Sequence, residues 1–237
     1  MESSGSGRKC LVITGGSRGI GLAAARRFQD AGHRVVNLSR SPSPIPDVVQ
    51  IKVDLSEQSW ADAAAEPLTD AVRDMECIAL VHNSALQVPG AINEISPPKF
   101  REMLEVSVVG PAILNRLLLP HMRPGSAILY VGSTLSLRAT PHMAAYVTCK
   151  HAVVGLMRST CQDLAETGVH TSCVCPGFTD TEMLQRYGGD AMGRLAALST
   201  QKRLIAPREV AEAIYFAATN PVVNGSVLSA DLGFVEP

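Results

Sequence analysis

Short apolar runs alternate with longer amphipathic segments along almost the whole chain. The runs carry little polar alternation, which is typical of strands that are buried on both faces of a parallel sheet. We expect strands at Lys9–Thr14, Arg34–Ser39, Val48–Val53, Cys77–His82, Ala127–Gly132, Val169–Cys175 and Ser226–Ala230. We expect helices at Gly19–Ala31, Gln58–Asp74, Pro98–Leu119, Ala144–Gly168 and Arg208–Thr219. This alternation predicts an α/β fold, a doubly wound seven-stranded parallel sheet with right-handed crossovers.

The amino-acid composition is consistent with an α/β fold. The chain has 237 residues, of which 46% are hydrophobic, so one large domain over residues 9–237 is expected after a flexible Ser/Gly-rich tail over residues 1–8. The net charge is −1 and no stretch concentrates Lys or Arg, which argues against a nucleic acid or an anionic membrane as partner and favours a small molecule.

The scattered cysteines and the lack of a signal-peptide pattern in the first residues predict a reducing compartment. The six cysteines are scattered without Cys-x2-Cys pairs, so neither a metal site nor a disulfide framework is expected. Cys173 and Cys175 alternate along an expected strand and therefore face the same side. The first residues lack a basic start followed by an apolar core, and no run of about 18 apolar residues suggests a membrane span. We therefore expect a cytoplasmic protein.

A glycine-rich turn joins the first expected strand to the first expected helix. Gly15, Gly19 and Gly21 let the backbone approach a pyrophosphate, and the new helix offers unpaired N–H groups to the anion. A plain turn is the alternative. The strand before it and the helix after it favour phosphate binding.

Candidate site residues follow the first six strands at their carboxyl ends, where ligands bind in an open α/β sheet. They are Gly15, Arg40, Asp54, Asn83, Ser133 and Pro176. One crevice can hold all of them. Tyr146 and Lys150, four apart on one helix face, add a phenol beside an ammonium that stabilises its phenolate, which suits proton transfer near neutral pH.

These motifs together resemble the short-chain dehydrogenase/reductase family, from about Lys9 to Gly233. The glycine loop reads Thr14-Gly15-Gly16-Ser17-Arg18-Gly19-Ile20-Gly21, and Tyr146-x3-Lys150 resembles the catalytic pair, with Ser133 where the family keeps its serine. Asn83-Ser84-Ala85 resembles the family's Asn-Ala-Gly segment, and Pro176-Gly177-Phe178-Thr179-Asp180-Thr181 resembles its Pro-Gly segment. The resemblance implies a Rossmann-like fold and hydride transfer between a nicotinamide and a carbonyl or secondary alcohol.

The resemblance also implies roles for individual residues. Tyr146 would protonate the substrate oxygen, Lys150 would bond the nicotinamide ribose and Ser133 would polarise the carbonyl. The cofactor would also contact Gly15, Ser17, Arg18, Ile20, Gly21, Asn83, Ala85, Pro176, Gly177, Thr179 and Thr181. One departure is Ser107, which replaces the family's asparagine in a segment reading Val106-Ser107-Val108-Val109-Gly110. The family's asparagine positions a relay water, so this relay is expected to be altered.

Cofactor choice depends on the end of the second strand, which carries no acid. Ser39 and Arg40, with Arg18, offer charge-assisted hydrogen bonds to a 2′-phosphate, so NADP(H) is favoured over NAD(H). The alternative for Arg40 is a solvated loop charge. By resemblance Asp54 would accept from the adenine amino group and Leu55 would line the ring, whereas a helix cap is the simpler reading of Asp54.

Substrate and assembly are less defined by the sequence. Residues 182–206 have the length of a lid over the pocket and carry apolar side chains that favour an apolar or aromatic substrate, although packing of two short helices explains them equally. A 3-oxoacyl-thioester reductase is the alternative activity, and a non-catalytic NADP(H) sensor or scaffold is an alternative of another class. By resemblance we expect a homotetramer or homodimer that pairs the two long middle helices.

Overall fold

The structure is a computed structural model and describes residues 8–234. Seven parallel strands form one sheet in the order β3-β2-β1-β4-β5-β6-β7. The strands are β1 (Lys9–Thr14), β2 (Arg34–Ser39), β3 (Val49–Lys52), β4 (Cys77–His82), β5 (Ala127–Val131), β6 (His170–Pro176) and β7 (Ser226–Ala230). The predicted fold class is therefore confirmed. The expected tail, apart from Arg8, and the last three residues lie outside the described range.

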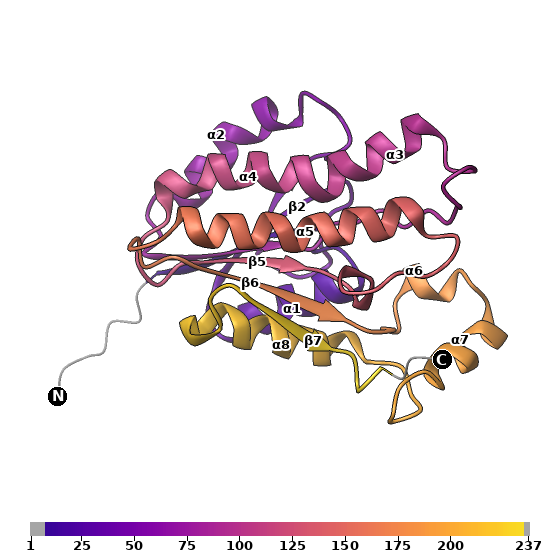
Figure 1. Cartoon of the computed structure of the whole chain (residues 1–237). Coiled ribbons are helices and arrows are strands. Elements are labelled where there is room, and N and C mark those ends of the chain that lie inside the picture. The colour runs from indigo at the N-terminus through magenta and orange to yellow at the C-terminus, as the bar shows by residue number, and fades with distance from the viewer. Residues whose placement is uncertain (1–7, 235–237) are drawn as a thin grey trace.

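Helices cover both faces of the sheet (Figure 1). On one face lie α2 (Trp60–Val72), α4 (Gly110–Leu118) and α5 (Ala144–Asp163), and on the other lie α1 (Gly19–Asp30) and α8 (Pro207–Thr219). Each layer has its own buried apolar cluster. Tyr130 and Phe28 are among the largest fully buried side chains, one in each cluster.

The expected helix Pro98–Leu119 is not a single α-helix. It consists of α3 (Pro97–Leu104), a π-helical turn at Glu105–Val109, α4, and a short 3-10 turn at Leu119–His121. Pro111 explains the wider turn, because it has no N–H to donate to the carbonyl of Ser107 four residues earlier. The chain therefore widens around Ser107.

The long helix after the fifth strand ends earlier than expected. It stops at Asp163, and Glu166 then adopts a left-handed conformation with φ 66°. Gly168 lies beyond the helix in the turn to β6, where an added Cβ would lie 2.7 Å from Cβ of Pro124. Close packing of two loops, and not a helix stop, requires glycine at this position.

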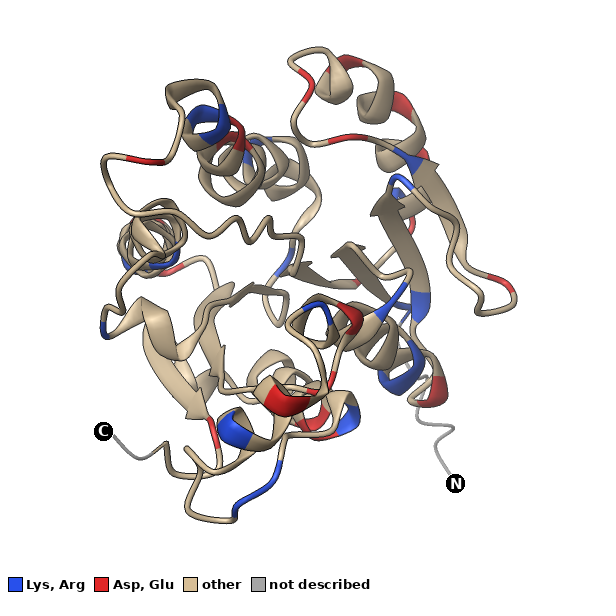
Figure 2. Cartoon of the chain, turned by 90° about the vertical axis from the view of Figure 1, so that its right-hand side faces the viewer, with Lys and Arg blue, Asp and Glu red and all other residues tan. Residues whose placement is uncertain are grey.

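Seen from the side on which the strands end, basic and acidic residues are interspersed (Figure 2). No run long and apolar enough to span a membrane was expected, but the continuous helical run Pro97–His121 is long and apolar enough by length and composition alone. Leu114 and Leu118 of this run are fully buried against the sheet, and 44% of its apolar window is buried in the structure.

Candidate active site

A cavity of about 1120 Å³ opens at the carboxyl ends of the strands. All the site residues expected from the sequence line it except Ser107: Gly15, Ser17, Arg18, Ile20, Gly21, Ser39, Arg40, Asp54, Leu55, Asn83, Ala85, Ser133, Tyr146, Lys150, Pro176, Gly177, Thr179 and Thr181. The topology brings them together because parallel strands end at the same edge. Among residues 8–234 no group of three or more His, Cys, Asp or Glu side chains is arranged to hold a metal ion.

The glycine loop is closely packed and leaves its helix end open. Gly15 has φ +72°, and a Cβ on Gly21 would lie 2.1 Å from the Gly15 carbonyl oxygen, so neither position accepts a larger residue without a shift. Helix α1 starts at Gly19, and no side chain caps its N-terminus. The first N–H groups of α1 are thus free of a side-chain acceptor and face the cavity end suited to an anion.

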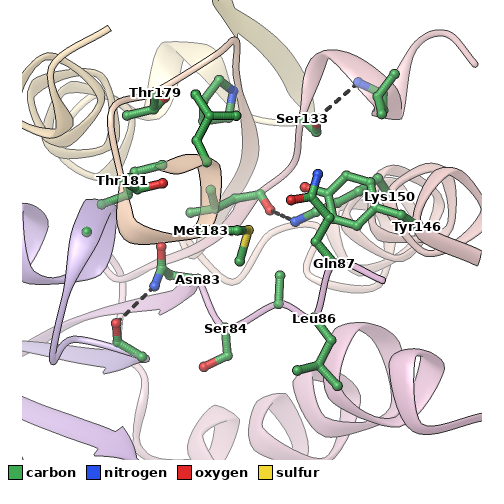
Figure 3. Close-up of a pocket in the computed structure, with 18 of the residues that line it drawn as sticks. Asn83, Ser84, Leu86, Gln87, Ser133, Tyr146, Lys150, Thr179, Thr181 and Met183 are labelled. Atoms are coloured by element: carbon green, nitrogen blue, oxygen red, sulfur yellow. Dashed lines mark hydrogen bonds between the residues drawn. The ribbon is translucent and has the colours of Figure 1, made fainter. Parts of the chain in front are cut away.

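Thr14 and Asn83 join the glycine loop to the turn after β4. The Thr14 hydroxyl oxygen accepts from the backbone N–H groups of Asn83 and Ser84, both at 3.0 Å. The Asn83 amide in return donates to the carbonyls of Thr14 at 3.0 Å and Gly15 at 3.2 Å (Figure 3). The two loops are therefore held in register.

Asn37 supports the glycine loop through a hydrogen bond with Gly16. It is fully buried on β2, and its side-chain oxygen accepts from the backbone N–H of Gly16 at 2.7 Å. Its amide donates to the hydroxyl of Ser39 at 2.9 Å and to the side chain of Gln50 at 2.7 Å. This network orients the end of β2, where cofactor choice was expected to be decided.

Two arginines lie at this end of the cavity, each beside a carboxylate. Arg40 lies 3.7 Å from Asp54, and Arg18 lies 3.4 Å from Glu182. Partial burial opposes ionisation of Asp54, but hydrogen bonds from Ser56 and the charge of Arg40 hold the pKa of Asp54 below its usual value. Asp54 is therefore a charged, fixed acceptor at neutral pH.

At the other end of the cavity lie Ser133, Tyr146 and Lys150 (Figure 3). Tyr146 and Lys150 are buried, and the Lys150 ammonium lies 5.6 Å from the centroid of the Tyr146 ring. Lys150 donates to the carbonyl of Val131 at 2.7 Å. The hydroxyl of Ser133 accepts from the N–H of Leu135 at 3.1 Å, which holds it at the end of β5.

The thiols of Cys173 and Cys175 pack beneath the backbone that carries Ser133. Cys173 and Cys175 are fully buried with their sulfurs 3.8 Å apart, so the prediction that they face the same side of the strand is confirmed. A Cβ on Gly132 would lie 2.6 Å from the Cys175 sulfur. The hydrogen bond with Cys173 and the N–H of Ser133 hold the pKa of Cys175 below its ordinary value despite burial. This packing fixes the backbone that carries Ser133.

Ser107 stands apart from the cavity. It is buried in the π-helical turn. Burial raises the pKa of the thiol of Cys149, the residue before Lys150, and the nearby Ser107 side chain partly offsets that rise. Any influence of Ser107 on the site thus passes through Lys150 or the widened turn.

The segment 182–206 contains α6 (Glu182–Gln185) and α7 (Gly189–Ala196). Met183 of α6, Leu195 of α7 and Tyr187 in the turn between the two helices line the cavity. Gln87 and Phe234 also line the cavity, although no motif singled them out. Gln87 follows the Asn83 segment on the same loop, whereas Phe234 comes from the far end of the chain, a contact that only the fold reveals.

Comparisons with known proteins identify the family of this chain. Residues 9–191 match the family model described as short chain dehydrogenase. A cis-4-hydroxycyclohexanecarboxylate dehydrogenase from Sinomonas cyclohexanicum is 30% identical over 240 residues, covering 95% of this chain and 96% of the relative. A 2-(R)-hydroxypropyl-CoM dehydrogenase from Xanthobacter autotrophicus is 29% identical, covering 94% of this chain and 97% of the relative.

Solved structures show the same architecture. The ligand-free aldohexose dehydrogenase of Thermoplasma acidophilum superposes with a TM-score of 0.87 at 26% identity, covering 95% of this chain and 94% of the other. The family match, the parallel sheet and the polar residues gathered at its carboxyl edge lead to one conclusion: the chain belongs to the short chain dehydrogenases, a family of oxidoreductases that bind a nicotinamide cofactor.

Proposed function

We propose that the protein is an NADP(H)-dependent oxidoreductase that interconverts a carbonyl group and a secondary alcohol. The observation that carries the proposal is that Ser133, Tyr146 and Lys150 share one cavity with the glycine loop and Arg40. Family membership supplies the reaction class, and the choice of cofactor and the residue roles are inferred from the contacts described above.

The residues present fit a dinucleotide phosphate. The uncapped start of α1 and the close-packed glycines suit a pyrophosphate, and Arg18 and Arg40 suit a 2′-phosphate. No acid follows β2 directly, where a carboxylate would repel that phosphate. Leu55 and Asp54 would hold the adenine, while Thr179, Thr181 and Pro176 would border the nicotinamide. When bound, this cofactor supplies or accepts the hydride.

The side chains of the protein hold and move the proton. Tyr146 gives its hydroxyl proton to the substrate oxygen in the direction of reduction, and Lys150 stabilises the phenolate that remains. Ser133 donates to the same oxygen as negative charge develops on it. Burial of Tyr146 and Lys150 keeps bulk water from weakening these interactions.

Ser107 acts at a distance in this proposal. Its position in the widened turn at Glu105–Val109, and its effect on the pKa of Cys149, the residue before Lys150, support a place behind Lys150. We assign it a positioning role for Lys150 and for a water that resupplies the proton.

The substrate is proposed to be an apolar or cyclic small molecule. Leu135, Met183, Leu184 and Leu195 give the substrate end an apolar wall, and residues 182–206 would act as a lid over it. The relative that acts on cis-4-hydroxycyclohexanecarboxylate supports a ring-bearing secondary alcohol.

The test is NADPH oxidation by purified protein with cyclic and aromatic ketones, aldehydes, quinones and 3-oxoacyl thioesters, with NADH in parallel. Turnover that Tyr146→Phe lowers at least about 100-fold, with NADPH affinity retained, is expected from loss of the general acid. Full turnover in that variant refutes the mechanism.

The same assay separates the two alternatives. Activity confined to thioesters selects the 3-oxoacyl-thioester reductase, whereas NADPH binding without turnover of any substrate selects the sensor. The preference for free small molecules rests on the loop before β5, where residues 122–126 contain a single basic residue, Arg123, for an acidic carrier.

Assembly and compartment complete the proposal. Val109, at the end of the π-helical turn before α4, and Gly155 of α5 are exposed, whereas Val153 and Val154 of α5 are buried against the sheet. We propose a dimer or tetramer through α4 and α5, checked by light scattering. All six cysteines are unpaired, which agrees with a reducing, cytoplasmic setting.

A further inference from the structure

A carboxylate of the lid segment faces the guanidinium that we assign to the 2′-phosphate. Glu182 is the first residue of α6, and its side chain lies 3.4 Å from Arg18 of the glycine loop. The two backbones are close here, because a Cβ on Gly19 would lie 3.3 Å from the methyl group of Thr181. Residues far apart in the sequence thus meet at the mouth of the cofactor cavity.

The two acids beside the two arginines differ in how firmly they are held. Asp54 accepts two hydrogen bonds from Ser56, at 3.0 and 2.7 Å, in addition to its pair with Arg40. Within residues 8–234, Glu182 has Arg18 as the one ion-pair partner of its side chain. Glu182 is therefore the acid that an incoming anion displaces more readily.

We propose that Glu182 is a cofactor-specificity residue that competes with the 2′-phosphate for Arg18. It weakens NADPH binding relative to NADH, and phosphate binding releases the start of the lid segment from the glycine loop. This inference rests on the proposed function, in which Arg18 binds the 2′-phosphate.

The geometry indicates that Glu182 competes with the 2′-phosphate for Arg18 and does not help Arg18 to bind it. The side chains of Arg18 and Glu182 are 55% and 64% exposed and share a single contact, so the carboxylate orients the arginine weakly. A phosphate with nearly two negative charges at the same guanidinium is repelled by that carboxylate. NADH carries no such phosphate, and the pyrophosphate that both cofactors share experiences the same carboxylate, so its effect cancels from the ratio of the two affinities.

The experiment compares dissociation constants for NADPH and NADH, measured by fluorescence titration of the full chain, in the wild type and Glu182→Gln. The NADH-to-NADPH ratio of dissociation constants is expected to rise about 2- to 5-fold, the size of one exposed ion pair. The gain should shrink at high salt, because exposed charges are screened.

Glu212→Gln is the matched control. Glu212 lies on α8, pairs with Arg27 of α1 at 2.8 Å and does not line the cavity, so the variant removes the same charge without touching Arg18. Its ratio should stay at the wild-type value. An equal rise in the control would show a general charge effect and overturn the proposal.

The remaining outcomes are decisive as well. An unchanged or smaller ratio in Glu182→Gln overturns competition, because the carboxylate would then be neutral or supportive. A wild type that binds NADH more tightly than NADPH refutes the cofactor assignment, whatever the variant does. The two failures are therefore distinguishable in one set of titrations.

Discussion

Thr14→Val tests whether the glycine loop and the turn after β4 are joined by one hydroxyl. Thr14 is 2% exposed, and its oxygen accepts from the N–H groups of Asn83 and Ser84. Valine has nearly the same shape, so the core loses no volume. What changes is that two backbone donors lose their acceptor.

The cost follows from those two donors. A buried donor left without a partner costs about 1–3 kcal/mol. Both N–H groups in this turn share one acceptor and lie in a half-buried segment, so a total of roughly 2–4 kcal/mol is expected. Since Asn83 also holds the carbonyls of Thr14 and Gly15, NADPH affinity should fall with stability.

Urea unfolding measures the first effect, and NADPH titration the second. Thr219→Val is the matched control, because Thr219 is exposed on α8 and donates to the carbonyl of Tyr215 within its own helix. That variant should change the free energy of unfolding by no more than about 0.5 kcal/mol. If Thr14→Val matched the control, the hydroxyl would not join the two loops.

Two further predictions concern charge. Arg40→Asp should weaken NADPH binding about 10- to 100-fold, the value of a hydrogen bond to a charged group, with NADH binding unchanged. Arg73→Asp, at the residue directly after α2, is the charge-matched control, and an equal loss for both cofactors contradicts the role of Arg40. Burial lowers the pKa of His82 to about 4, although a hydrogen bond with Asn115 raises that pKa and so offsets part of the effect of burial. Because the unfolded imidazole takes a proton near pH 6.5, His82 has no effect on stability above that pH and destabilises the fold as the pH falls towards 4, by roughly 1.4 kcal/mol per unit. Urea midpoints at pH 7, 6 and 5 should show this slope, and His82→Gln should reduce it; an unchanged slope excludes His82 as its source.

Most of the sheet and the cofactor end of the site were predictable because their signals are local. An apolar run, a glycine turn and a helix sit within Lys9–Asp30, and chain alternation then places every strand end on one edge. The polar contacts that support this end were not predictable. Asn37 beneath Gly16 is separated from it by 21 residues, and nothing in an apolar strand marks which side of the loop its amide will reach.

The π-helical turn shows a different limit, since its cause is visible in the sequence. Ser107 differs from the family pattern in its side chain. Pro111, four residues later, has no N–H to donate to the backbone carbonyl of Ser107. The same widened turn would form with asparagine at 107. The substitution therefore changes the side chain that influences the pKa of Cys149, whereas the proline accounts for the shape of the helix behind Lys150. The serine side chain at position 107 and the widened backbone turn around it therefore have separate causes. The effect of replacing asparagine by serine on proton supply should be judged from the side chain alone.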